Sequence, residues 1–150
     1  MTTAISLVSQ KGGVGKTTLG LNLGFALAQA NVRTLVVDVD PQGSIAHSLM
    51  ATTQEVSGLM GYLQGARLEE AAWSTRLSQL SILPVGRVSG LQGAALHQQL
   101  EDGLRLQLLV ESASSFDVVL FDTPAGLAGG TLGAMRASDL VFTVLQAEPL

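Results

Sequence analysis

The sequence predicts an α/β fold in which a doubly wound, mostly parallel sheet is flanked by helices. Two observations point to this class. Short apolar runs rich in β-branched residues alternate along the chain with segments of helical periodicity, and a glycine-rich loop joins the first run to the first helix. Strands that alternate with helices at this spacing require right-handed crossovers, so neighbouring strands should be parallel.

The first half of the chain supplies three of the expected strands. The run Ala4–Ser9 is apolar, and Thr17–Ala30 carries apolar residues at helical spacing. Arg33–Val39 shows the β-branched bias of a buried parallel strand, and turn residues follow it. The remaining elements expected in this half are short helices at Ile45–Met50, Leu59–Gln64 and Leu68–Trp73 and a strand at Leu80–Val85.

The second half continues the alternation. One long helix is expected over Leu91–Ser112, because Leu96, Leu100, Leu104 and Leu108 share a face, although Gly103 lowers its stability by about 1 kcal/mol. The elements expected after it are a strand at Asp117–Thr123, a helix at Leu127–Ala137 and a buried strand at Leu140–Gln146. Because no closing helix follows this strand, we expect residues 1–150 to be a single domain that lacks its C-terminal third.

Composition narrows the function classes. Hydrophobic residues make up 47% of the chain and charged residues 13%, which indicates a packed core rather than disorder. The absence of cysteine excludes disulfides, iron–sulfur clusters and thiolate metal sites. A net charge of −4 argues against a broadly basic surface for DNA on this part of the chain. We expect a cytoplasmic location.

The stretch from Lys11 to Thr18 (KGGVGKTT) predicts a phosphate-binding loop. Phosphates need several converging backbone N–H donors, and glycine lets the chain curl closely enough to supply them, while the following helix start adds its own free N–H groups. We expect Lys16 to reach the β- and γ-phosphates, Thr17 to ligate Mg²⁺ and Thr18 to meet the α-phosphate. The backbone of the loop should bind the nucleotide through Gly12, Gly13, Val14 and Gly15.

Three aspartates follow predicted strands that should end near this loop. Asp122 is expected to be a metal-binding carboxylate, and Asp38 should hold the metal or orient Thr17, Lys16 or metal-bound water. Asp40 opens a loop containing proline and glycine, so we expect it to position the attacking water. The segment after Asp122 resembles a phosphate-sensing loop, and the N–H of Gly126 is its expected donor.

The three motifs KGGVGKTT, DVDPQG and DTPAG together resemble the deviant Walker A P-loop ATPases of the ParA/MinD family. The resemblance covers the whole chain in order. It implies a P-loop domain that binds ATP and Mg²⁺, dimerises around ATP and hydrolyses it slowly when a partner protein stimulates it. By position, Lys11 is the family's signature lysine, which reaches the partner subunit's phosphates. The catalytic residues implied are Lys11, Lys16 and Asp40.

Within that family, the DPQG form favours a ParA-like protein that positions a cargo such as a plasmid, a chromosome or a protein complex. The cysteine-dependent branches, the nitrogenase iron proteins and arsenite pumps, do not fit this chain. The resemblance implies that nonspecific contact with nucleoid DNA would come from a C-terminal region outside this chain, and a membrane is a less expected track. The alternatives are a MinD-like membrane-cycling ATPase, an accessory regulator of polysaccharide synthesis, and a small-molecule ATP-dependent ligase or kinase.

The chain has two histidines, His47 and His97. Phosphoryl transfer of this kind needs no histidine base. His47 and His97 are therefore expected to be ordinary residues on helix surfaces, with His97 facing solvent beside Gln98 and Gln99.

Overall fold

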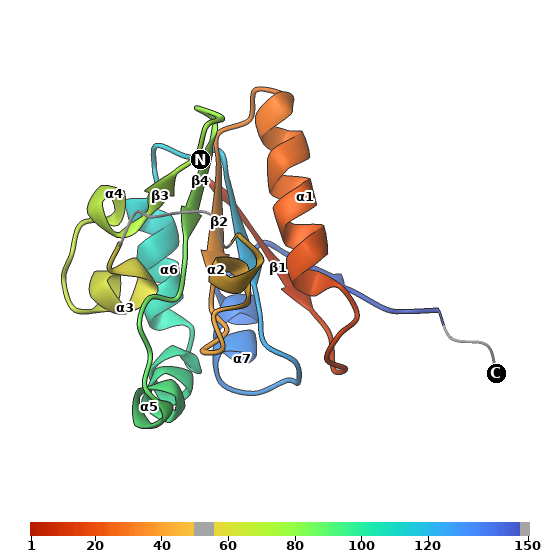
Figure 1. Cartoon of the computed structure of the whole chain (residues 1–150), viewed down its shortest axis with the longest axis vertical. Helices are drawn as coiled ribbons and strands as arrows, with labels where there is room; N and C mark the ends of the chain where they lie inside the picture. Colours follow the sequence, from red (N-terminus) through yellow and green to blue (C-terminus); the bar gives the residue numbers. More distant parts are fainter. Residues whose placement is uncertain (50–55, 148–150) are drawn as a thin grey trace.

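A six-stranded sheet forms the centre of the structure, a computed structural model that describes residues 1–49 and 56–147 (Figure 1). Its strands are β1 (Thr3–Val8), β2 (Thr34–Asp38), β3 (Trp73–Ser74), β4 (Leu80–Leu83), β5 (Val118–Asp122) and β6 (Leu140–Thr143). They lie in the order β3-β4-β2-β5-β1-β6, and every neighbouring pair is parallel except β3 and β4. The predicted fold class is confirmed.

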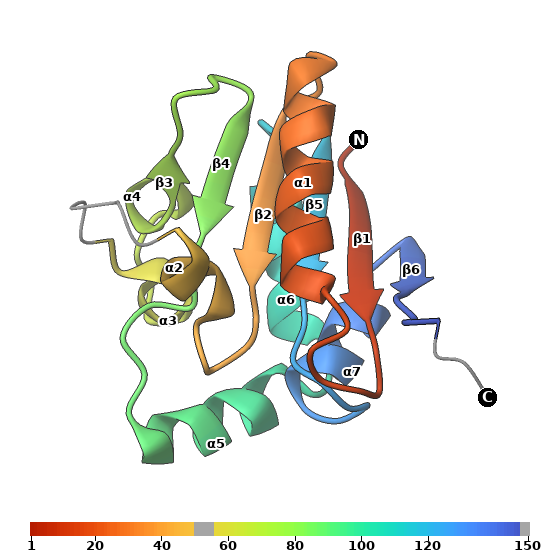
Figure 2. The same cartoon turned by 45° about the vertical axis from the view of Figure 1, so that its right-hand side comes forward.

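Helices cover both faces of the sheet (Figure 2). One face is covered by α1 (Lys16–Gln29) and α2 (Ser44–Ser48). The other is covered by α3 (Gly58–Leu63), α4 (Leu68–Ala71), α6 (Leu104–Ser112) and α7 (Gly130–Arg136). The remaining helix, α5 (Gly90–Leu100), lies across the edge at which the parallel strands end. No helix of the described residues is long and apolar enough to cross a membrane.

The core is divided in two by the alternation of side chains along the strands. Val36, Leu120 and Ile82 face α1 and α2, whereas their neighbours in the chain face the layer of α6 and α7. The period of two along a strand produces this division. Because both faces are apolar, the central strands are buried throughout, which is typical of parallel sheets.

Helix α1 lies unusually close to the sheet because glycine stands at two of its contact points. A Cβ atom added to Gly24 would lie 2.7 Å from Cγ2 of Val36, and one added to Gly20 would lie 3.0 Å from Cδ1 of Leu7. Larger residues would push the helix outward. This close packing fixes the first turn of α1 at the carboxyl end of β1.

The prediction of one helix over Leu91–Ser112 was wrong. Gly103 has φ +81° and is the N-cap of α6, so the chain turns there and α5 and α6 are separate helices. Glycine adopts the left-handed conformation at little cost, so the chain can leave the helical path at this position. As a result Leu104 and Leu108 are about half exposed, and Leu106 and Leu109 take the buried positions instead.

Other boundaries also differ from the prediction. The segment expected as a helix over Leu68–Trp73 ends at Ala71, and Trp73 begins the short antiparallel strand β3. Helix α7 begins at Gly130 rather than Leu127. The last strand, expected to be buried, is exposed along its whole length because it pairs with β1 on one side only. The helix expected over Ile45–Met50 is α2, and Met50 lies outside the described residues.

Candidate functional site

The glycine-rich loop joins β1 to α1 and leaves the start of the helix uncapped. Gly15 is the N-cap of α1 with φ +94°, and no side chain caps the first turn. Gly13 also has positive φ, +74°, and a Cβ at either glycine would meet nothing within 4 Å. Glycine is therefore needed here for its conformation and not for space. The first-turn N–H groups of α1 remain available for an anion.

A cavity of ≈ 340 Å³ lies over this helix start, at the carboxyl-end edge of the sheet. Most of the predicted site residues meet there. Its walls are formed by Gly12, Gly13, Gly15, Lys16, Thr17, Thr18, Asp40, Ser44, Thr123 and Ala125. No role was predicted from the sequence for Ser44 or Thr123, although Ser44 directly follows the DVDPQG motif and Thr123 lies within DTPAG. The predicted site residues that do not line this cavity are Lys11, Val14, Asp38, Asp122 and Gly126.

Lys16 is the first residue of α1 and is only 8% exposed. A buried ammonium group is costly unless an anion lies nearby. The charge of Lys16 acts on Asp122 and lowers the pKa of that carboxyl, although burial acts more strongly in the opposite direction. Lys16 is therefore held inside the cavity wall, where a bound phosphate would add a second anionic partner.

Thr17 and Asp122 form the clearest contact of the site. The Thr17 hydroxyl donates to Oδ2 of Asp122 over 2.6 Å, while Oδ1 of Asp122 is buried and has no hydrogen-bond partner among the described residues. Burial raises the pKa of Asp122 to about 6. An orphaned carboxylate oxygen beside a threonine hydroxyl fits a hydrated Mg²⁺ ion, which prefers oxygen ligands. No group of three acidic or histidine side chains that could hold a metal occurs in the described ranges, so phosphate oxygens and water would complete the shell.

Asp38 lies beside Asp122 in the parallel register of β2 and β5 and is fully buried. Its Oδ1 accepts from the N–H of Asp40 and its Oδ2 from the N–H of Ile45, both over 3.0 Å. Burial raises the pKa of Asp38 to about 7, and the charge of Asp122 adds to the effect. Asp38 thus anchors both ends of the loop that carries Asp40. Each carboxylate oxygen keeps a further acceptor position, so the predicted contact with metal-bound water is compatible with this geometry.

Asp40 stands at the start of that loop and faces the cavity. Its Oδ1 accepts from the N–H of Gln42 over 2.9 Å, and its carbonyl accepts from the N–H of Gly43 over 2.9 Å. These bonds make a compact turn, in which Gly43 has φ +66°. Within the part of the chain that the structure describes, the second carboxylate oxygen of Asp40 accepts no hydrogen bond, so it is available to orient a water.

The loop after β5 is tied to the phosphate loop. Thr123 donates to the carbonyl of Leu7 over 2.7 Å, and the N–H of Gly126 donates to the carbonyl of Ser9 over 3.0 Å. The predicted role of Gly126 as a phosphate-sensing donor therefore requires this bond to be exchanged for one to the ligand. Lys11 is exposed on the outer part of the phosphate loop.

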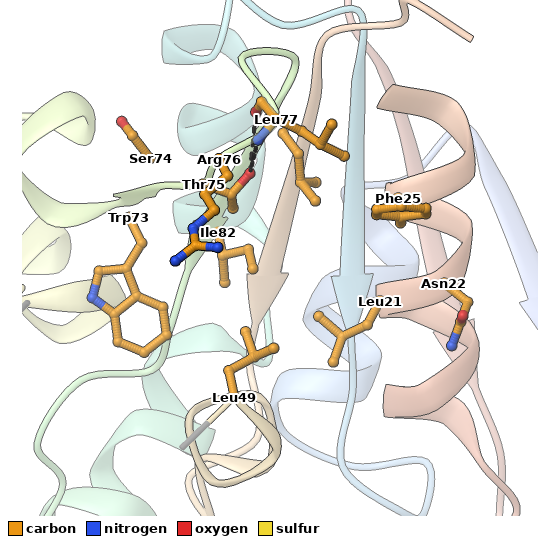
Figure 3. Close-up of a pocket in the computed structure, with 11 residues that line it drawn as sticks. Leu21, Asn22, Phe25, Leu49, Trp73, Ser74, Thr75, Arg76, Leu77 and Ile82 are labelled. Atoms are coloured by element: carbon orange, nitrogen blue, oxygen red, sulfur yellow. Dashed lines mark hydrogen bonds between the residues drawn. The ribbon is translucent and has the colours of Figure 1, made fainter. Parts of the chain in front are cut away.

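A larger cavity of ≈ 560 Å³ lies elsewhere, between α1 and the β3–β4 hairpin (Figure 3). Its lining is mainly apolar: Leu21, Phe25 and Leu49 face Ile82 and Trp73 across it. Arg76 is the one charged residue among the described residues that line it. It contains neither the glycine loop nor any of the three aspartates, so its size does not make it the phosphate site.

The sequence interpretation of His97 was wrong. This residue is half-buried rather than facing solvent, and its Nδ1 accepts from the N–H of Gly130 over 3.3 Å. No sequence signal marked this contact, because it joins residues 33 positions apart through the break at Gly103. His47 is exposed as predicted, with its Nδ1 2.9 Å from the carbonyl of Gly43.

Comparison with known proteins agrees with this geometry. Residues 2–150 match the family described as an AAA domain (AAA_31). The chain is 38% identical over 150 residues to the chromosome partitioning protein ParA of Caulobacter vibrioides, in an alignment that covers 96% of this chain and 56% of that protein. The chain belongs to the ParA/MinD family, on its ParA-like branch.

Solved structures of similar proteins have the same fold. The septum site-determining protein MinD of Pyrococcus horikoshii, complexed with Mg-ADP, has a TM-score of 0.79 and 33% identity, covering 96% of this chain and 58% of that chain. Cobyrinic acid a,c-diamide synthase of Mycobacterium smegmatis, with a bound ATP analogue and magnesium, has a TM-score of 0.80 and 30% identity. The match covers 99% of this chain and 62% of that chain. The ParA-like chain described here thus spans little more than half the length of the relatives it matches.

Proposed function

We propose that this chain is the nucleotide-binding part of a ParA-like ATPase, which binds ATP with Mg²⁺ and hydrolyses it to ADP and phosphate. One observation carries the proposal: Lys16, Thr17 and Asp40 line a single cavity at the uncapped start of α1, and Thr17 is hydrogen-bonded to the buried Asp122. Cation, metal ligands and a water-positioning carboxylate are the parts that phosphoryl transfer requires. The ligands named for the MinD and synthase structures support the same nucleotide chemistry.

Each residue of the site has a distinct role in this proposal. The first-turn amides of α1 and the loop amides of Gly12, Gly13, Val14 and Gly15 bind the phosphates, and Lys16 neutralises their charge. Mg²⁺ would be held by Thr17 and Asp122, with Asp38 next to them, and supplies charge neutralisation at the phosphate oxygens. Asp40 orients the attacking water. Thr18 lines the same cavity and would meet the α-phosphate.

ATP also joins two subunits in this proposal. Lys11 is exposed and lies outside the lining of the cavity, which supports a role toward the partner subunit's phosphates rather than its own. Such a cation acts as an arginine finger does, by stabilising charge in the transition state. Hydrolysis would be slow until a partner protein stimulates it, and it would separate the two subunits.

The cargo in this proposal is a plasmid, a chromosome region or a protein complex that the ATPase cycle positions. The proposal rests on the names of the ParA relatives and on the DPQG loop. Nonspecific binding to DNA, in the cytoplasm and on the nucleoid, would be part of the same cycle. A membrane track of the MinD type is the less favoured form of the same cycle.

A small-molecule ATP-dependent enzyme is the second candidate. The observation in its favour is the 30% identity to cobyrinic acid a,c-diamide synthase. Such an enzyme needs a substrate beside the γ-phosphate, and the cavity over α1 is bounded there by Asp40, Ser44 and Thr123. The two candidates differ in one measurable property, because only the ParA-like cycle requires ATP to change the oligomeric state.

The deciding experiment is the molecular mass in solution, measured by light scattering with Mg-ADP and with Mg-ATP. We expect a monomer with ADP and a dimer with ATP. Lys11→Ala should abolish the ATP-dependent dimer while nucleotide binding persists, and Asp40→Ala should retain ATP and accumulate the dimer. Arg76→Ala is the matched control, because it removes one exposed positive charge from the other cavity. A mass that does not respond to nucleotide would refute the ParA-like cycle.

A further inference from the structure

Helix α5 lies against both loops that surround the phosphate cavity. Its first contact is Gly93, which is buried under the loop of Asp40: a Cβ atom added to Gly93 would lie 3.4 Å from Cβ of Pro41. A cleft of ≈ 320 Å³ between Pro41–Gln42 and the start of α5 marks the same boundary. At Gly93 the Asp40 loop and α5 are therefore separated by little more than the width of one methyl group.

The second contact of α5 is His97, four residues later. Its Nδ1 accepts from the N–H of Gly130 over 3.3 Å, which requires the proton to be on Nε2. Its ring also fills the space beside Gly129, where any Cβ atom would overlap it. Gly129 has φ +53° and ψ −122°, so it is restricted to glycine by conformation as well. His97 thus sets the position of the last residues of the loop that follows β5.

The two contacts share one face of α5, because residues four apart on a helix are neighbours on its surface. The far end of each loop is tied to the nucleotide site. The loop after β5 is bonded to the phosphate loop through Gly126 and Ser9, and the Asp40 loop is held by Asp38. The buried apolar residues Leu96 and Leu100 fix α5 between these contacts. Figure 2 shows α5 lying across the ends of the strands.

We propose that α5 couples the Asp40 loop to the loop of residues 124–129, and that His97 is the positioning residue of this coupling. Through Gly130, His97 holds the 124–129 loop in one position. Through Gly93, one turn earlier, the same helix limits the position of Pro41. A change at either loop is thereby carried to the other, so the two loops respond to nucleotide together. The coupling itself does not require nucleotide, but its role in the ATPase cycle rests on the proposed function.

The test is hydrogen exchange of the whole chain without nucleotide, followed by mass spectrometry of peptides. His97→Ala removes the acceptor for Gly130, and exchange over residues 126–131 should become about 2- to 10-fold faster, the change expected for one hydrogen bond. Exchange over residues 40–45 should rise as well, because of the coupling. His97→Asn can place Oδ1 near the position of Nδ1 and should restore both segments. Gln98→Ala is the control, an exposed neighbour on the same helix.

The reciprocal variant starts from the other contact. Gly93→Ala adds a methyl group 3.4 Å from Pro41, whereas the control Gly90→Ala adds one where nothing lies within 4 Å. Coupling is reciprocal, so Gly93→Ala should alter exchange over residues 126–131 and Gly90→Ala should not. A response of His97→Ala confined to residues 126–131, or none in either segment, would overturn the coupling.

Steady-state kinetics provides the second readout. In His97→Ala, kcat for ATP should fall about 5-fold with KM changed less than 2-fold, because the loop is displaced but the phosphate loop is intact. His97→Asn should recover most of kcat. Failure of the proposed function is distinguishable from failure of the coupling: a chain that does not hydrolyse ATP but shows linked exchange in the two loops retains the coupling and loses the ATPase.

Discussion

The Thr17 hydroxyl donates a 2.6 Å hydrogen bond to Asp122 and so joins the first turn of α1 to the carboxyl end of β5. The other oxygen of Asp122 is buried without a partner among the described residues. A buried acceptor in this state is costly, and a water bound to Mg²⁺ would satisfy it. The same two side chains would therefore link a bound metal to two elements of the fold.

We expect Asp122→Asn to weaken binding of Mg-ADP about 10- to 100-fold and binding of ADP in EDTA much less, because the loss acts through the metal. Titration calorimetry under both conditions measures the two affinities. Glu111→Gln, an exposed acidic residue of α6, is the charge-matched control. An equal loss of ADP affinity with and without Mg²⁺ would show that Asp122 acts on the phosphate loop and not on the metal.

Lys16→Ala should abolish stabilisation by nucleotide. In the unmodified chain, saturating Mg-ATP at about 100 times its Kd should add about 2.7 kcal/mol to the free energy of unfolding. Without Lys16 the phosphates lose their buried cation, and the melting temperature should no longer respond to nucleotide. Thermal melting with and without Mg-ATP measures the effect, with Arg76→Ala as control. A variant that still gains several degrees with Mg-ATP would contradict the role given to Lys16.

Stability should depend on pH through the buried carboxyl of Asp38. Burial raises its folded pKa to about 7, whereas an unfolded aspartate titrates at about 3.9. Between these values the folded state binds more protons than the unfolded state, so the free energy of unfolding should decrease as pH rises from about 4 to 7. Asp122, with a pKa raised to about 6, acts in the same direction.

Urea unfolding of the nucleotide-free chain at pH 5 and pH 7 tests this dependence. Asp38→Asn should reduce the difference between the two pH values, even though losing one acceptor lowers stability at both. Asp117→Asn is the control: Arg33 lowers the pKa of Asp117 to about 2, so that carboxyl contributes its stabilisation above about 4 and loses it only at lower pH. If the free energy of unfolding of Asp38→Asn changed between pH 5 and pH 7 as much as that of the unmodified chain, burial would not raise the pKa of Asp38.

Gly133→Ala should destabilise the fold by about 1–3 kcal/mol, because its Cβ would overlap the carbonyl of Leu100 and force α7 away from α5. The same substitution at Gly90 meets open space and should be neutral or slightly stabilising. Chemical denaturation of both variants provides the comparison. Similar stability of the two variants would contradict the close contact of α5 and α7.

Much of the fold and most of the phosphate site could be predicted from the sequence because their signals are local. The continuous run of β-branched and apolar residues in β2 and the spacing of apolar residues in α1 depend only on neighbours in the chain. The glycines of the phosphate loop are similarly local, since Gly13 and Gly15 are needed for their own backbone angles. The convergence of Asp40 and Asp122 followed from the rule that parallel strands end at one edge.

The parts that sequence reasoning missed depend on tertiary contacts. Gly103 was treated as a weak point in one helix, but its left-handed conformation ends α5 and lets α6 start in another direction. The leucine spacing across it continued a helical period that the chain does not follow. The contact of His97 with Gly130 arises only from this turn. Strand β3 was missed because two residues carry no periodicity.

The uncapped start of α1 has a practical consequence for anyone who purifies this protein. Its first-turn N–H groups have no side-chain cap, and Lys16 lies beside them. Small inorganic anions present in a buffer, such as sulfate or phosphate, compete for the same donors. A melting temperature measured in phosphate would start from a partly occupied loop, and the increment from added nucleotide would be understated. Buffers built on bulky organic zwitterions provide the proper baseline for comparing nucleotides.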